Sequence, residues 1–449
     1  MSKQRIQLSD HFTYSRLLRF VLPCIGTMLF TSIYGIVDGL CVSNFVGKTA
    51  FAAVNLIMPL PMLLGTIGFM LGTGGSAIVG ITLGEGDQKK ADRYFTLFLL
   101  AALVSVSVLA VLGIVFLRPI AVLLGAKGEL LDYAVRYGRI LMVSLPTFAL
   151  QNMFQSFFVT AEKPHLGFWF TVGAGCTNMV LDVLMVGIWG WGVEGAAIAT
   201  FISQLVGGVL PVFYFIDRSN SSRLHLCKTS FYSKVLRDAC INGSSELMTN
   251  LSMSLVNILY NYQLLRLAGE NGVAAYGVIM SAVFLFVAVF EGYAVGSAPI
   301  VSFHYGARNH TEVHNLYRKS LRLIAVVAVT LTLASMFIIP CVARIFVGYD
   351  AELLALTSRA FRLYALSFLI MGFNVYASSF FTALGDGVTS ALISFLRTLV
   401  FQVIAILLLP LLLGIDGIWL AVTAAELAAL AVSAAMLLTK DKVFHYRKA

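Results

Sequence analysis

The stretch FVLPCIGTMLFTSIYGIVDGLCVSNFV, residues 20–46, decides the fold. It is long enough to cross a bilayer as a helix, and Asp38 is its only charged residue. A lone carboxylate at membrane depth costs from about 3 to above 10 kcal/mol, so it is normally retained for an ion or substrate pathway. A second lone acid, Asp182, lies in the apolar run TVGAGCTNMVLDVLMVGIWG, and Asn178 precedes it by one helical turn. The two stretches therefore predict membrane helices that carry a cation site.

Composition extends this prediction to the whole chain. Of its 449 residues, 59% are hydrophobic and only 12% are charged, and the mean hydropathy is +0.88. The long apolar runs are continuous rather than alternating, which favours helices over a closed barrel. We expect an all-α membrane protein with twelve transmembrane helices, at residues 16–43, 51–82, 93–117, 132–160, 165–189, 193–216, 236–265, 272–303, 318–346, 355–384, 388–413 and 416–438.

Nothing in the sequence indicates catalysis, a metal centre or a cofactor. The six cysteines form no CxxC pair, and neither HExxH nor GxSxG occurs. An integral-membrane enzyme would need a catalytic cluster at one interface, and only the loop segment DRSNSSRLH, residues 217–225, leaves that alternative open. We expect no enzyme activity, no catalytic residue, no cofactor and no nucleic-acid partner.

The net charge of +9 is distributed unevenly among the loops. Basic residues gather near both termini, after the second and eighth predicted helices and in the central polar loop, whereas the alternate loops are nearly bare. The positive-inside rule then places both termini in the cytoplasm of a bacterial inner-membrane protein. Anionic headgroups are the simplest partner for these basic loops.

The central loop divides the chain into halves that resemble each other. The shift that places Asn152 on Asn374 also aligns several Gly and Ala positions of one half with those of the other. Six helices per half is an even number, so the halves share an orientation and are related by a pseudo-two-fold axis along the membrane normal. We expect an N-terminal lobe at 1–217, a linker at 218–235 and a C-terminal lobe at 236–449, with alternating access by rocking.

Helical rise places four polar side chains of the first half at one depth. With both termini inside, Asp38, Asn178, Asp182 and Thr200 all fall in the outer half of the bilayer. Hard oxygen ligands suit Na⁺, and two neighbouring carboxylates suit a shared proton. The alternative is a polar cluster that only ties helices together.

The second half carries a different set of ionisable residues. Glu246, Glu291 and Arg397 fall in the inner half of the bilayer, where an Arg–Glu pair would relieve the burial cost of both partners. This set supports either a structural ion pair or a role in substrate binding or gating. Glu426 is a further lone acid to which the sequence assigns no role.

Two further predictions concern a hinge and a cavity lining. Pro23 interrupts the first helix, either as a hinge or as a proline tolerated by its neighbours. Aromatic side chains are expected to line a substrate cavity, with candidates Tyr34, Phe148, Phe154 and Tyr376.

Six motifs together resemble one family. They are VDGLCVSNFVG (37–47), AAVNLIMPL (52–60), GTGGSAIVGITLGEGD (72–87), WGVEGAAIAT (191–200), AAYGVIMSAVFLFVAVFEGYAVGSAPIVSFHYGARN (274–309) and FFTALGDG (380–387). The chain resembles the multidrug and toxic compound extrusion (MATE) transporters, in the bacterial branch with DinF-like and MepA-like members. The resemblance implies a monomeric antiporter that exchanges Na⁺ or H⁺ for amphipathic, drug-like compounds. In the DinF-like branch it also implies a cation site at the positions of Asp38, Asn178, Asp182 and Thr200.

Another branch uses acids of the second lobe for coupling, but the local sequence around Glu246, NGSSELMTN, departs from that branch. The nearest rival function is a lipid or oligosaccharide-lipid flippase of the same superfamily. A flippase would have a more basic central cavity, whereas Arg397 is the only clear arginine at membrane depth here.

Overall fold

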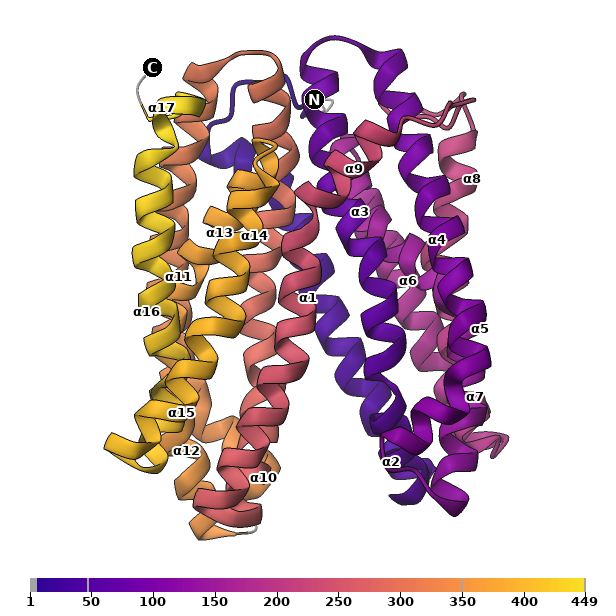
Figure 1. Cartoon of the computed structure of the whole chain (residues 1–449), viewed down its shortest axis with the longest axis vertical. Coiled ribbons are helices and arrows are strands. Elements are labelled where there is room, and N and C mark those ends of the chain that lie inside the picture. The colour runs from indigo at the N-terminus through magenta and orange to yellow at the C-terminus, as the bar shows by residue number, and fades with distance from the viewer. Residues whose placement is uncertain (1–5, 47, 349, 448–449) are drawn as a thin grey trace.

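The computed structural model describes residues 6–46, 48–348 and 350–447, and within them every regular element is a helix. The helices form two bundles that stand side by side (Figure 1). The first lobe contains α1 (Tyr14–Phe45), α2 (Lys48–Ile57), α3 (Pro59–Gly84), α4 (Gln88–Leu123), α5 (Gly128–Thr160), α6 (Pro164–Asp182), the π-helix η1 (Val183–Ile188), α7 (Gly192–Gly208) and α8 (Leu210–Ile216).

The second lobe repeats this layout. It contains α9 (Ser233–Asn242), α10 (Ser244–Gly306), α11 (His310–Val347), α12 (Ala351–Ala365), α13 (Phe368–Ala383), α14 (Gly387–Phe395), the π-helix η2 (Leu396–Val400), α15 (Phe401–Leu413), α16 (Ile415–Thr439) and the short α17 (Asp441–Phe444). The described residues between Ile216 and Ser233, where the sequence predicts a linker, form no helix. The proposed domain boundaries stay a prediction.

These helices form twelve membrane-spanning segments. Among the described residues, nine helices are long and apolar enough to span a membrane when α10 is counted once. The backbone of α10 breaks at Gly269, so α10 supplies two spans. The remaining two are the bent pair α12 and α13, with an angle of 46° between them, and α5, whose first turns carry charged residues. The prediction of twelve membrane helices in two six-helix lobes is confirmed.

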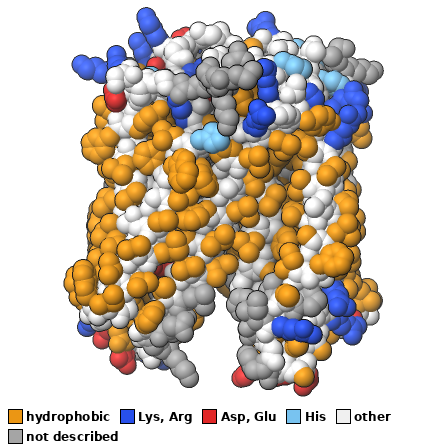
Figure 2. Space-filling view, turned by 180° about the vertical axis from the view of Figure 1, so that it is seen from behind, with side chains coloured by type: hydrophobic (Ala, Val, Ile, Leu, Met, Phe, Trp, Pro, Cys, Tyr) orange, Lys and Arg blue, Asp and Glu red, His pale blue; other side chains and the backbone are white. Residues whose placement is uncertain are grey.

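The lobes contact each other at the end of the molecule that holds both termini. There α1 and α3 of the first lobe pack against α10 of the second. A methyl group added at Gly74 of α3 would collide with the backbone of Ala239 and Gly243, and one added at Gly292 of α10 would collide with the backbone of Ile25. Small residues at helix contacts permit this close approach. At the opposite end a notch separates the lobes (Figure 2).

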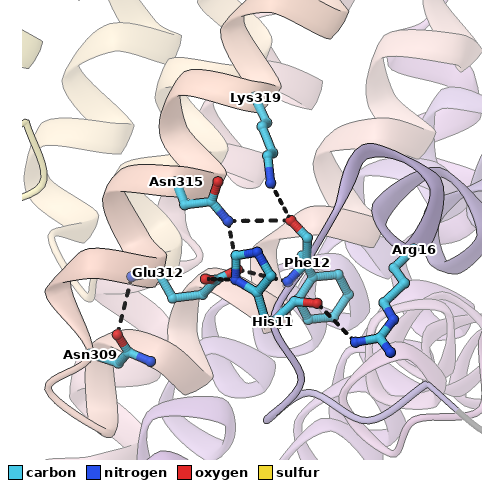
Figure 3. A network of polar contacts seen from close by, with 7 residues as sticks. All are labelled: His11, Phe12, Arg16, Asn309, Glu312, Asn315 and Lys319. Carbon is cyan, nitrogen blue, oxygen red and sulfur yellow. Dashed lines mark hydrogen bonds and ion pairs between the residues drawn. The ribbon is translucent and has the colours of Figure 1, made fainter.

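We call the end where the lobes meet the closed end. A non-helical N-terminal segment, residues 6–13, crosses between the lobes there and includes a turn at residues 8–10; we call it the strap. The Leu8 amide donates to Glu162 Oε1 of the first lobe at 2.9 Å, and the Phe12 amide donates to Glu312 Oε1 of the second at 2.8 Å. Figure 3 shows His11 on the same Glu312 carboxylate, at 2.6 Å, and Lys319 donating to the Phe12 carbonyl. Leu8 and Phe12 are fully buried, so the strap is an integral part of the closed end.

The halves also share local backbone features at the offset that the sequence predicts. Gly192 and Gly414 both adopt φ +58°, immediately before or at the start of α7 and α16. Asp87 and Asn309 both accept a hydrogen bond from the backbone amide three residues later and so cap α4 and α11. The repeat therefore extends from sequence to the turns that begin corresponding helices.

Candidate functional site

Two carboxyl groups meet inside the first lobe. Asp38 of α1 and Asp182 at the end of α6 lie within hydrogen-bonding reach of each other. Asp182 is fully buried, and Asp38 Oδ1 and both carboxylate oxygens of Asp182 have no hydrogen-bond partner among the described residues. Two ionised carboxylates offer only acceptors, so their contact becomes a hydrogen bond when one of them carries a proton. We call Asp38 and Asp182 the acid pair.

Within the part of the chain that the structure describes, no positive charge compensates the acid pair. Neither carboxylate forms an ion pair with a Lys, Arg or His of these residues. Buried charges in proteins are normally paired or coordinate a metal ion. An acid pair of this kind can take up a proton or a monovalent cation, because either would neutralise charge that the protein leaves unbalanced.

The acid pair lies where a helix changes its winding. Asp182 is the last residue of α6, and the π-helix η1 begins at Val183. The wider turn shows in the Trp189 amide, which donates to the Leu184 carbonyl at 2.8 Å, five residues earlier. Short π-helical segments are rare and are frequently located at functional sites. Nothing in the sequence of this stretch signals the change.

The other two predicted members of the site lie on adjacent helical surfaces. Asn178 is one turn before Asp182, is 2% exposed, and its side-chain nitrogen has no partner among the described residues. Thr200 lies on α7, which packs against both α1 and α6. No hydrogen bond of the described residues joins Thr200 to either carboxyl group; its carbonyl accepts from the Ser203 hydroxyl. The structure thus brings the two acids together, and cation binding by Asn178 and Thr200 stays a prediction.

Tyr137 of α5 is a neighbour of the acid pair that the sequence analysis missed. It is 1% exposed and close enough to interact electrostatically with both carboxylates. Its hydroxyl lies 3.7 Å from the Met58 sulfur. Tyr137 falls in the charged segment DYAVRYGR, which obscures its burial. Tyr34 lies near Asp38, and its ring packs beside Gly175 of α6.

The second lobe pairs its buried arginine, Arg397, with an acid of the same lobe. Arg397 of η2 donates to Glu426 Oε1 of α16 at 2.8 Å, with exposed side-chain fractions of 11% and 0%. Asn374 of α13 donates to Glu426 Oε2 at 2.7 Å and accepts from the Ser433 hydroxyl at 2.9 Å. The partner of Arg397 is therefore Glu426, and the expectation of a pair with Glu246 or Glu291 is wrong. Sequence separation cannot reveal which acid a neighbouring helix presents.

Glu246 and Glu291 instead line a small polar cavity at the seam between the lobes, together with Arg397. Its volume is about 60 Å³, and since one water needs about 10–15 Å³ of such space, a few waters fit. Drug-sized ligands need cavities of about 300–1,000 Å³. Most of its other lining residues carry hydroxyl groups: Thr73, Ser76, Ser156, Ser245, Thr249, Ser378, Ser379, Thr382 and Ser394. In this conformation the cavity can hold water or a small ion but no drug-like molecule.

The predicted cavity aromatics occupy packed positions. Phe154 is 1% exposed and stacks on Phe215 with ring centroids 5.5 Å apart. Tyr376 is 2% exposed and lies against Tyr293 and Phe380. Both therefore belong to the lobe cores, because tight helix packing fills these positions. Phe148 of α5 packs against Gly65 of α3.

The first helix continues through Pro23. α1 runs unbroken from Tyr14 to Phe45, and the Pro23 carbonyl accepts from the Thr27 hydroxyl at 2.9 Å. A proline removes one helical hydrogen bond and so weakens the helix locally. A hinge at this position stays a prediction.

The MatE family model matches residues 23–184 and matches again over residues 247–408, one segment in each lobe. The chain belongs to the MatE family. The double match also confirms the internal repeat, and it makes this chain a membrane transporter rather than an enzyme.

Curated MATE relatives align along almost the whole chain. The multidrug export protein MepA of Staphylococcus saprophyticus is 21% identical over 436 residues, covering 96% of this chain and 95% of the relative. MepA of Staphylococcus aureus strain MRSA252 is 21% identical over 441 residues with the same coverage. A solved MATE family transporter of the MOP superfamily, described in an outward-facing conformation, superimposes with a TM-score of 0.91 over 100% of both chains at 23% identity. At this identity the structural likeness shows the MATE fold.

Proposed function

We propose that this MATE transporter is an antiporter that exports amphipathic organic compounds in exchange for Na⁺ or H⁺. The acid pair is the observation that carries the proposal, because its buried negative charge has no partner among the described residues. The names of the MepA relatives support multidrug export as the direction and substrate class. A monomer without a cofactor is the simplest form consistent with this proposal.

The coupling follows from differential affinity. A cation bound by Asp38 and Asp182, with Asn178 and Thr200 as further ligands, neutralises the acid pair and changes the preferred packing of α1 on α6 and η1. A ligand shifts a conformational equilibrium only by its difference in affinity for the two states. The cation therefore has to favour the state with weak substrate affinity, and release of the compound on the outside follows from that.

We propose that the closed end faces the cytoplasm and that the chain lies in a bacterial inner membrane. Basic side chains gather at the end with the termini, above a broad hydrophobic belt (Figure 2). This charge distribution supports the orientation. The notch between the lobes then opens to the outside, which is the arrangement expected for substrate release.

The decisive experiment is export in proteoliposomes with ethidium as the substrate. An imposed Na⁺ gradient and an imposed pH gradient are applied separately to the wild type and to Asp38→Asn, Asp182→Asn and the double variant. One gradient is expected to drive export in the wild type, and the three variants are expected to lose the response. Glu194→Gln is a matched control, since Glu194 is an exposed acid that pairs with Arg136 at 3.6 Å.

Two results would contradict the proposal. Full gradient-driven export by the double variant would remove the acid pair from coupling. Failure of both gradients in the wild type, with transfer of a lipid-linked probe instead, would establish the rival flippase function. The geometry argues against a flippase, because Glu426 neutralises Arg397 and the cavity beside it is not basic.

A further inference from the structure

A large groove lies outside the notch between the lobes. A groove with a volume of about 1730 Å³ runs along the closed end of the first lobe, between the first turns of α1 and those of α6. The strap, the turn that precedes α6 and residues 219–221 of the central loop complete it. We call this groove the basic groove. It is separate from both the acid pair and the Arg397 cavity.

Four basic side chains line the basic groove, and among the described residues none of them pairs with an acid. Arg16 donates to the His11 carbonyl at 3.2 Å, and Lys163, only 9% exposed, donates to the Ser221 hydroxyl at 2.9 Å. Arg19 and His165 are exposed, and within the described chain neither takes part in a hydrogen bond or ion pair. The groove therefore presents several donors whose charge the protein leaves uncompensated.

The groove also contains two acids, Glu162 and Asp10. Glu162 pairs with Arg223 at 2.6 Å and accepts from the Leu8 amide. Asp10 Oδ2 accepts from the Gln7 amide at 3.1 Å. Arg223 compensates Glu162, whereas Asp10 keeps its negative charge. Arg16, Arg19 and Lys163 outnumber Asp10, so the net charge of the groove is positive. A net positive charge favours an anionic ligand.

An apolar wall continues from the basic side chains toward the middle of the membrane. Leu22 of α1 and Trp169 of α6 are 55% and 64% exposed, and Phe168 and Gly26 lie beside them. Leu22 is eight residues into its helix and Trp169 five into its own, which places both about 8–12 Å from the basic end. Tryptophan is enriched at this depth of the membrane interface. Charge above an apolar wall matches an anionic headgroup followed by acyl chains.

We propose that the basic groove binds an anionic glycerophospholipid of the adjacent leaflet. The phosphate lies among Arg16, Arg19 and Lys163, and the first acyl carbons follow Leu22 and Trp169. Basic pockets between membrane helices on the cytoplasmic side are known to take anionic headgroups. A free phosphate would leave the apolar wall unused, and a drug-like cation would be repelled by the uncompensated charges.

The site has a consequence for the closed end of the transporter. The strap forms one side of the basic groove through Ile6, Gln7 and Asp10, and it fastens the two lobes through Glu162 and Glu312. A lipid in the groove contacts α1, α6 and the strap at once. Lipid binding therefore favours the conformation in which the strap is docked.

Native mass spectrometry of the full chain in neutral detergent tests the proposal, with dioleoylphosphatidylglycerol and dioleoylphosphatidylcholine as probes. Each basic residue near an anionic surface contributes on the order of tenfold or less in affinity, so Arg16→Gln with Arg19→Gln is expected to weaken phosphatidylglycerol binding about 30-fold. Both arginines are exposed, so the variant is expected to fold. The matched control is Lys89→Gln with Lys90→Gln, which removes two exposed charges from α4 at the same end and is expected to change binding less than twofold.

Two further measurements test whether the groove recognises a whole lipid or only a phosphate group. Trp169→Ala is expected to weaken phosphatidylglycerol binding several-fold. Inorganic phosphate at the same concentration is expected not to displace the lipid. Equal losses in the groove and control variants, equal binding of the two lipids, or displacement by phosphate would each overturn the proposal. Gradient-driven export is not part of this readout, so a failed antiport experiment leaves the result interpretable.

Discussion

The two lobes share one architecture but differ in the buried charge beside their π-helices. In the first lobe the acid pair borders the π-helix η1 and has no positive partner in the described chain. In the second lobe the π-helix η2 contains Arg397, which pairs with Glu426, and Asn374 donates to the other oxygen of the same Glu426 carboxylate. A π-helix therefore lies beside unpaired carboxyl groups in the first lobe and carries a paired arginine in the second. The proposed antiport mechanism assigns cation binding to the first lobe, with the second lobe as a fixed frame.

The repeat shows which positions account for this asymmetry. At the offset that aligns Asn152 with Asn374, Gln204 stands where the second lobe has Glu426. Gln204 Oε1 and Asn152 Nδ2 have no partner among the described residues. Gly175 corresponds to Arg397, and two aromatic rings of α1 pack against it. The first lobe thus lacks both charged members of the Arg–Glu–Asn network and keeps only its asparagine, Asn152.

The largest expected effect is on coupling in the first lobe. Asp38→Asn with Asp182→Asn is expected to reduce gradient-driven export at least 100-fold, while the midpoint of thermal unfolding in detergent rises because two buried unpaired acids are removed. Export assays and unfolding scans on the same preparation measure both quantities. A drop in the unfolding midpoint together with lost export would indicate a structural role for the acid pair.

The next effect is on stability in the second lobe. Arg397→Met leaves Glu426 buried without its partner and is expected to cost about 3–5 kcal/mol of unfolding free energy. The double variant Arg397→Met with Glu426→Leu is expected to recover most of this loss, because an apolar pair of similar volume is often neutral. Denaturant unfolding in detergent measures both.

Arg359→Met is the control for this comparison. Arg359 pairs with Asp416 near the surface and is 69% exposed, so its loss is expected to cost only about 0–1 kcal/mol. If Arg397→Met cost no more than this control, the second lobe would not depend on its ion pair.

A smaller effect tests the symmetry of the turns. Gly192→Ala and Gly414→Ala each force a side chain onto a backbone at φ +58°, and each is expected to cost about 1–3 kcal/mol. Gly277→Ala is the control, since Gly277 is helical and a methyl group there meets no atom within 4 Å. Thermal unfolding measures the loss of stability in each variant. Clearly unequal losses at Gly192 and Gly414 would show that the two turns share a conformation but do not contribute equally to stability.

The smallest effect concerns the starts of α6 and α14. Asp386 caps α14 by accepting from the Thr389 amide at 3.2 Å and pairs with Lys440 at 2.8 Å, whereas Lys163 provides no side-chain cap for α6. Asp386→Ala is expected to cost about 1 kcal/mol. The matched change Lys163→Ala removes no cap and is expected to leave the start of α6 intact, as hydrogen exchange of its first amides would show.

The stability lost in Asp386→Ala is expected to decrease as the pH falls. Burial raises the pKa of the Asp386 carboxyl, but hydrogen bonds from Lys440 and Thr389 outweigh burial and hold this pKa below its usual value. The stabilisation is present above the unfolded pKa of about 3.9 and is lost as the pH falls through the folded pKa. The difference between wild type and variant should therefore be full at pH 7 and shrink below about pH 4; a difference independent of pH would contradict this.

Sequence by itself determined the membrane class, the helix count, the internal repeat and the acids of the first lobe. These properties follow from local hydropathy, from a constant offset and from the rarity of charge in apolar runs. Asp38 and Asp182 stand out because each is alone in its stretch.

Only the tertiary structure decided which charges meet. Glu246 and Glu291 were the expected partners of Arg397, yet helix packing brings Glu426 to it. Tyr137, the winding change at the end of α6 and the basic groove also depend on how separate helices are juxtaposed. The physical reason is that hydropathy fixes the depth of a side chain along the membrane normal, whereas its neighbours within the membrane plane depend on the rotation and packing of every helix around it.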